Sequence, residues 1–387
     1  MEVKKLYYED CRLREFTARV LSCTETADGF HVTLDATAFY PEGGGQACDL
    51  GTLADAHVLD VQENAEQILH LCDRPLEPGS TVTGRIDWER RFDLMQQHTG
   101  EHIVSGIIFQ TYGYHNVGFH MGEQFITIDF DGPIPPEDLP AIQDRANRAV
   151  WEDLALRCWV PEPEELPAIN YRRKRDLPWP VRIVQIPGID QCACCGVQVA
   201  STGQVGAIKL LSCVKFHQGV RIEMVCGGRA MSLFDRSWEQ NRQVSQAFSA
   251  KPLETGEAAR RMNDQLAAEK LRAAGLEKQV FAATAQTYQG QALALHFGQS
   301  LTPGAVRELA DTIAKHAQTA AVLSGSDGAG YTLCIVSHEQ DVRPLGSATV
   351  KALDGRGGGK PQAFQGSIRA KETEIRAFFA QWQAANP

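Results

Sequence analysis

The chain lacks any long apolar run. No stretch of its 387 residues approaches the ~20 consecutive apolar residues that a membrane-spanning helix needs. The N-terminal sequence MEVKKLYYED is charged and lacks the apolar segment of a secretory signal peptide. We therefore expect a cytoplasmic protein with no membrane partner.

The chain also lacks an excess of positive charge and a set of cysteines suited to a disulfide scaffold. Its net charge is −10, so its overall composition does not indicate a nucleic-acid partner, although a local basic patch can still bind phosphate. The run YRRKR at residues 171–175 is either such a patch or a solvated loop. The eleven cysteines are odd in number and scattered, apart from positions 192, 194 and 195. This usage favours reduced thiols and a metal site.

Four segments of different periodicity follow one another, and together they predict an α+β fold. Residues 1–90 contain short alternating stretches between turn residues, a pattern typical of a small β-barrel. Residues 91–232 combine helices and strands in an α+β domain. Residues 233–288 predict a helical connector, either a coiled-coil hairpin or a plain exposed helix. Residues 289–387 alternate strands and helices, which predicts a small α/β domain.

Two glycine runs stand out. The first lies in TAFYPEGGGQ at residues 37–46, and three consecutive glycines are poor in the interior of a strand or helix. They predict a loop whose bare backbone can approach another surface, with a tight turn between strands as the simpler interpretation. The second, GRGGGKP at 355–361, can bind phosphate through backbone N–H groups and a lysine. Pro361 breaks the Walker spacing, so we do not expect an NTPase.

A pair of histidines indicates a metal site. His98 and His102 are four residues apart in a helical pattern, which places both imidazoles on one face. Cys194, in the cluster CACCG, could supply a thiolate as a third ligand. Zn²⁺ accepts imidazole nitrogen and thiolate sulfur, usually with four ligands. The alternative is that the cysteines are small buried apolar residues and that His102 is a hydrogen-bonded core residue.

Four of these motifs, in this order, resemble AlaX in its long form, the free-standing relative of the editing domain of alanyl-tRNA synthetase. TAFYPEGGGQ resembles the family's T-x-F-Y-x-x-G-G-Q loop, and HTGEH at 98–102 resembles its H-x3-H motif. CGVQVASTGQVG at 195–206, with Cys194 before it, resembles the C-x-G-T-H-V-x-x-T-G-E-I-G segment. GGGKP at 357–361 resembles the signature of the C-terminal DHH-associated domain. Together the motifs extend over nearly the whole chain.

The resemblance implies a hydrolase that acts in trans and removes a wrong amino acid, usually serine and sometimes glycine, from the acceptor end of tRNA(Ala). It implies a glycine-loop barrel at 1–90, a zinc-binding editing domain at 91–232 and a DHH-associated domain at 289–387, with a homodimer through the C-terminal half as one option. The implied sites fall into four groups. They are Thr37 and Gln46 as catalytic-pocket residues; Gly43, Gly44 and Gly45 for close approach to substrate; His98, His102, Cys194 and Gln198 around one Zn²⁺; and Arg356, Gly358, Gly359 and Lys360 for tRNA.

One residue departs from the family pattern. The fourth family ligand is the histidine of C-x3-H, and this chain has Gln198 there. An amide oxygen is a poor zinc ligand beside imidazole. Zinc could keep three protein ligands, with water or Gln198 in the fourth place; Cys192 or Cys195 could replace the histidine; or the metal could be weak or lost. Two other functions are therefore open: a tRNA-binding module without hydrolysis, and editing of another mischarged tRNA such as Ser-tRNA(Thr).

Overall fold

The computed structural model describes residues 3–64, 67–173 and 180–386, in two compact units, Met1–Gln243 and Val244–Pro387. The predicted boundary at residue 90 lies inside the first unit, and the predicted connector at 233–288 contributes to both units. The last two residues of the basic run at 171–175 lie outside the described residues. Within the described part of the chain, no helix is long and apolar enough to cross a membrane.

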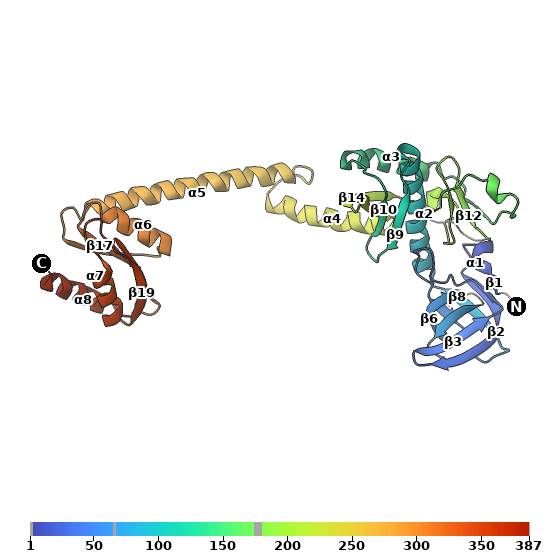
Figure 1. Ribbon diagram of the computed structural model, residues 1–387, viewed down its shortest axis with the longest axis horizontal. Helices are drawn as coiled ribbons and strands as arrows, with labels where there is room; N and C mark the ends of the chain where they lie inside the picture. The colour runs from blue at the N-terminus through green and yellow to red at the C-terminus, as the bar shows by residue number, and fades with distance from the viewer. Residues whose placement is uncertain (1–2, 65–66, 174–179, 387) are drawn as a thin grey trace. The chain divides into compact units, whose positions relative to one another are not determined.

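The first unit begins with the predicted barrel, which is confirmed. A short strand β1 (Lys4–Lys5) and helix α1 (Leu6–Glu9) precede it, and β1 pairs with β4 (Ala36–Thr37). The six barrel strands close in the order β2-β3-β7-β6-β5-β8. Figure 1 shows this barrel in blue, with β2, β3, β6 and β8 labelled. Their bounds are β2 Glu15–Thr26, β3 Gly29–Leu34, β5 Gly51–Leu53, β6 Ala56–Glu63, β7 Ile68–Cys72 and β8 Thr81–Ile86.

Helix α2 (Trp88–Tyr112) follows the barrel directly and carries the histidine pair. Asp87 caps its first turn by accepting a hydrogen bond from the Arg90 amide, and Gly113 ends it in the left-handed conformation at φ +76°. Most of the helix is buried, which a solvent-facing amphipathic helix would not be. The histidines therefore sit on the central element of the unit.

Two small sheets and further helices surround α2. One sheet has the order β14-β15-β10-β9, and the other the order β11-β12-β13. β14 and β15 form an antiparallel pair within the first of these sheets. The bounds are β9 Asn116–Met121, β10 Ile126–Phe130, α3 Leu139–Trp151, β11 Arg157–Trp159, β12 Ile183–Ile186, β13 Asp190–Ala193, β14 Ile208–Phe216, β15 Gly219–Cys226 and α4 Gly227–Ala247, with short 3-10 helices at Pro136–Asp138, Leu166–Ala168 and Thr202–Val205.

The second unit is a five-stranded sheet covered by helices on both faces, as predicted for a small α/β fold. The strand order is β16-β17-β18-β20-β19. One face packs against α6 and the end of α5, and the other against α7 and α8. The bounds are α5 Thr255–Gln286, β16 Leu293–Gly298, α6 Pro303–Ile313, β17 Thr319–Ser326, β18 Gly330–Val336, α7 Arg343–Ala352, β19 Gly355–Lys360, β20 Ala363–Ile368 and α8 Glu372–Ala385.

The C-terminal glycine run forms the edge strand β19, which the sequence did not predict, and its binding of phosphate stays a prediction. Gly357 and Gly359 face β20 so closely that a Cβ on either would overlap the carbonyl oxygen of Gln365 or Ala363. Glycine is needed here for close strand approach and not for a turn. Arg356, Gly358 and Lys360 alternate with them, and all three are exposed.

A buried histidine inside the barrel gives a pH prediction. His70 donates Nδ1–H to the Val32 carbonyl oxygen, and its Nε2 lies 2.9 Å from the Thr37 hydroxyl. Burial lowers the pKa of His70 to about 4. Above its ordinary pKa, folded and unfolded chains are both neutral at this residue. Below it, only the unfolded chain takes up the proton, so unfolding should cost about 2 kcal/mol less at pH 5 than at pH 7.

The measurement is urea unfolding at both pH values for wild type, His70→Gln and the control His31→Gln. Glutamine can keep one donor and one acceptor but does not titrate. His70→Gln should therefore lose less stability between pH 7 and pH 5 than the other two proteins. An equal loss in all three would show that His70 does not resist protonation.

Candidate metal centre and cavity

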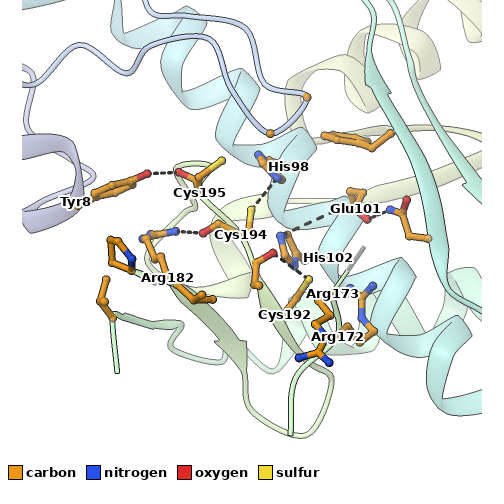
Figure 2. Close-up of a pocket in the computed structure, with 18 of the residues that line it drawn as sticks. Tyr8, His98, Glu101, His102, Arg172, Arg173, Arg182, Cys192, Cys194 and Cys195 are labelled. Carbon is orange, nitrogen blue, oxygen red and sulfur yellow. Dashed lines mark hydrogen bonds and ion pairs between the residues drawn. The ribbon is translucent and has the colours of Figure 1, made fainter. Parts of the chain in front are cut away.

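Three potential metal ligands converge on one point. His98 and His102 stack one helical turn apart, with ring centroids separated by 5.4 Å, and both are 2% exposed. Cys194 follows strand β13 and faces them (Figure 2). One ligand atom from each of the three residues lies within 4.8 Å of the others. The sequence motif thus forms a compact donor set in the folded chain.

Acceptors behind the histidines fix which nitrogen faces the sulfur. His98 Nδ1 lies 2.8 Å from Gln46 Oε1, and His102 Nδ1 lies 2.9 Å from Asp190 Oδ2. Both partners are oxygen acceptors, so each Nδ1 carries the hydrogen and each Nε2 is left for a ligand. His98 Nε2 is 3.3 Å from Cys194 Sγ. Arg172 holds Asp190 in turn, through bonds of 2.6 and 2.8 Å.

The local charges favour an anionic sulfur. Burial alone would raise the pKa of the Cys194 thiol, but the adjacent His98 and His102 outweigh it and hold that pKa well below its usual range. Burial likewise opposes protonation of His102, but Cys194 and Asp190 outweigh it and raise its pKa. A thiolate between two imidazoles that share a fixed orientation is a donor set that fits Zn²⁺.

The donor set opens onto a cavity of about 590 Å³. One wall is formed by Gly44 and Gly45 of the first glycine run, whereas Gly43 does not line the cavity. Gly43 and Gln46 exchange backbone hydrogen bonds of 3.0 and 2.9 Å across this two-residue turn. Gly44 and Gly45 occupy the left-handed region, at φ +62° and +83°. A Cβ on Gly44 would approach Cys195 Sγ to 2.8 Å. The run therefore forms a tight turn and also exposes bare backbone to the cavity, so the two interpretations of the sequence are compatible.

Comparisons with known proteins bear on this arrangement. The model for class II (A) tRNA synthetases matches residues 4–90, that for the threonyl and alanyl tRNA synthetase second additional domain matches 181–228, and that for the DHHA1 domain matches 286–385. The alanyl-tRNA editing protein Aarsd1 of Mus musculus is 28% identical over 386 residues, covering 93% of each chain. The chain belongs to the AlaX-like family of alanyl-tRNA editing proteins.

Relatives of this AlaX-like chain also include alanine–tRNA ligases. That of Thermofilum pendens is 31% identical, with 94% of this chain and 42% of the ligase covered. That of Pyrococcus furiosus is 36% identical, with 67% of this chain and 30% of the ligase covered. The AlaX-like chain thus spans less than half the length of these ligases.

Not every site residue predicted from the motifs lies at the cavity. Thr37 is fully buried in β4, and its hydroxyl contacts His70 in the barrel, so its position does not support a role in sensing a substrate hydroxyl. Gln46 is fully buried too and orients His98 from behind. Arg356, Gly358, Gly359 and Lys360 all lie in the second unit.

The amide of Gln198 has the opposite orientation to that of a ligand. Its nitrogen lies 3.7 Å from Cys194 Sγ, and its oxygen accepts the Thr99 hydroxyl at 2.8 Å. In this orientation Gln198 offers a hydrogen-bond donor to the centre, not an oxygen lone pair.

Several residues of the site were not predicted from the sequence. Asp190 and Arg172 carry no spacing signal, because only the fold brings them behind His102. Glu101 did carry one, because H-x-x-E-H is itself a known zinc-site pattern. Its carboxylate is buried and lines the cavity (Figure 2). It accepts hydrogen bonds from Ser105 and Asn116.

The support behind His102 gives a second prediction. In Asp190→Asn, the carboxylate that orients His102 and pairs with Arg172 is replaced by an amide of similar size. Outer partners of metal-binding histidines typically contribute about 10–100-fold to metal affinity, and we expect a loss of that size. Competition with a chromophoric chelator measures it. Asp131→Asn is the matched control, because Asp131 holds the exposed His115; equal affinity in both variants would contradict the assigned role.

Proposed function

We propose that this chain hydrolyses the aminoacyl ester of mischarged tRNA(Ala), with Ser-tRNA(Ala) as the main substrate and Gly-tRNA(Ala) as a second one, and that His98, His102 and Cys194 hold one Zn²⁺. The observation that carries the proposal is the convergence of these three donors, with fixed tautomers, on an open cavity. The family relationship supports tRNA(Ala) editing in general.

Each wall of the cavity has a part in this proposal. Zn²⁺, when bound, supplies Lewis-acid polarisation of an ester or of water. Gly44 and Gly45 present bare backbone to the acceptor end, and a Cβ on them would meet Cys195 Sγ at 2.8 Å or the Phe119 ring at 2.7 Å. The Glu101 carboxylate can accept a hydrogen bond from the substrate's ammonium group or from water.

Cations at the cavity suit the phosphates of a tRNA end. Lys5, Arg173 and Arg182 all line it. Arg182 lies over the Tyr8 ring at 4.6 Å and donates to the carbonyl oxygens of Cys194 and Gly196, at 3.0 and 2.9 Å. Arg182 therefore both supports the loop that carries Cys194 and places positive charge at the cavity. This local field can serve an anionic partner despite the net charge of −10.

A deacylation assay with Ser-, Gly- and Ala-tRNA(Ala) and with Ser-tRNA(Thr) tests the proposal. We expect release of serine and glycine from tRNA(Ala), with Ala-tRNA(Ala) spared and Ser-tRNA(Thr) slow. Tight tRNA binding without hydrolysis of any of these substrates would overturn the proposal in favour of a binding module. Preferred hydrolysis of Ser-tRNA(Thr) would assign the chain to another tRNA.

The exposed face of β19 gives a prediction for tRNA binding. We propose that Arg356 and Lys360 contact tRNA phosphates. The variant Arg356→Ala/Lys360→Ala should bind tRNA about tenfold more weakly, with the slope of log affinity against log salt reduced by about 2. Filter binding at several salt concentrations measures both. Lys315→Ala, which removes a cation paired with Asp311, is the control; identical slopes in all proteins would exclude β19 as a phosphate contact.

A further inference from the structure

Gln198 lies directly behind the metal-binding sulfur and is held in one orientation by Thr99. The Val199 amide donates to the Thr99 hydroxyl oxygen at 3.1 Å, so the single hydroxyl proton is available to Gln198 Oε1, 2.8 Å away. Gln198 is 2% exposed, so water does not compete for these bonds. The amide oxygen is thereby engaged on the side of Thr99, and the amide nitrogen is directed toward Cys194.

Two N–H groups of the loop that follows β13 donate to Cys194 Sγ. The Gly196 amide donates to it at 3.3 Å and Gln198 Nε2 at 3.7 Å. A Cβ on Gly196 would overlap the His98 ring, so this close approach depends on glycine. Hydrogen bonds from N–H groups favour the charged form of a buried acceptor. Backbone and side chain therefore hold a thiolate in place without supplying a ligand of their own.

We infer that Gln198 is a positioning residue for the Cys194 thiolate and not a metal ligand, and that the metal takes its fourth donor from the cavity. His98, His102 and Cys194 line the cavity, whereas Gln198 does not. Structural zinc sites have four protein ligands, whereas catalytic ones have three and bind water or substrate in the remaining place. Cys192 and Cys195 also line the cavity, but neither belongs to the donor group of His98, His102 and Cys194. The fourth place is therefore open to a small oxygen or nitrogen donor, such as water or the ester or amine of an aminoacyl group. This inference rests on the proposed metal site.

Cobalt substitution tests the inference without any tRNA. Co²⁺ replaces Zn²⁺ in the full chain, and its visible absorption reports the ligands, with azide as the added probe. Wild type should bind one Co²⁺ and change its spectrum on azide addition. Gln198→His adds a fourth protein donor, so its azide response should be lost. Gln198→Met removes the N–H donor at similar length; it should keep the azide response but bind metal about 10–100-fold more weakly.

The control is Gln185→Met, because Gln185 bonds only to Gln191 among the side-chain partners that the structure describes. It should match wild type. The inference is overturned if wild type binds no Co²⁺ or ignores azide, if Gln198→His responds as wild type does, or if Gln198→Met binds metal as tightly as wild type. If Gln198→His does not fold, the azide response of wild type and the metal affinity of Gln198→Met still test the inference. An active hydrolase could fail this test and an inactive protein could pass it, so its outcome is separate from that of the proposed function.

Discussion

His98→Ala should purify with little zinc, and its rate of deacylation of Ser-tRNA(Ala) should fall at least about 100-fold. This loss exceeds the one typical for a residue that only hydrogen-bonds to a metal ligand. The mutation removes one of the three donors that form this group among the described residues, and it leaves Gln46 without the imidazole that it orients. Metal content by plasma emission spectrometry and the single-turnover rate of serine release are the two measurements. Zinc content and rate should fall together, because among the described residues no histidine other than His98 and His102 belongs to this donor group.

His115→Ala is the matched control for His98→Ala. His115 also lines the cavity, but its imidazole is exposed and pairs with Asp131. It should keep the wild-type metal content. A His98→Ala protein that retains full zinc would mean that the metal is bound elsewhere, and retained activity without zinc would remove the metal from the reaction.

Arg91→Met should lower the free energy of unfolding of the first unit by about 3–5 kcal/mol. Arg91 is fully buried at the start of α2, and its guanidinium donates to both carboxylate oxygens of Asp49 and, at 2.6 Å, to the Ala38 carbonyl oxygen. Removing the cation leaves Asp49 charged in an apolar surrounding. Because Ala38 and Asp49 flank the glycine turn, the loss should also loosen the cavity wall. Urea unfolding followed by circular dichroism measures the change.

The double variant Arg91→Met/Asp49→Asn tests the cause. If an unpaired buried carboxylate is responsible, the double variant should be more stable than Arg91→Met alone, because the charge is removed as well. Arg242→Met breaks an exposed pair with Glu239 and should unfold at the wild-type urea concentration. If Arg91→Met behaves like Arg242→Met, the pair does not stabilise the junction between barrel and helix.

The sequence predicted the elements whose signals are local. Alternating stretches gave the barrel strands, and the spacing of His98 and His102 placed both on one helical face because helical geometry alone decides it. The strand formed by the glycine run at 357–359 was not predicted, since glycine serves turns and close strand pairing equally well and only the register with β20 distinguishes them. Thr37 was assigned by motif, but its burial against His70 depends on barrel closure, which no local pattern shows.

The residues that hydrogen-bond to the histidines of the site could not be predicted from local sequence patterns either. Asp190 is 88 residues from His102 in the chain, and Gln46 is 52 residues from His98. A carboxylate or amide that orients a histidine has no fixed spacing from it, because the fold supplies the distance. Glu101 is different: it lies inside the histidine motif and could have been singled out from the sequence.

Release of serine from tRNA(Ala) should depend on zinc at the centre formed by His98, His102 and Cys194. The most direct measurement is the single-turnover rate of serine release from Ser-tRNA(Ala) by the full chain, with bound zinc quantified in the same samples after graded removal by a chelator and after restoration. We expect the rate to rise in proportion to zinc occupancy up to one ion per chain. A rate that stays constant as zinc is removed, or no release at full occupancy, would contradict it.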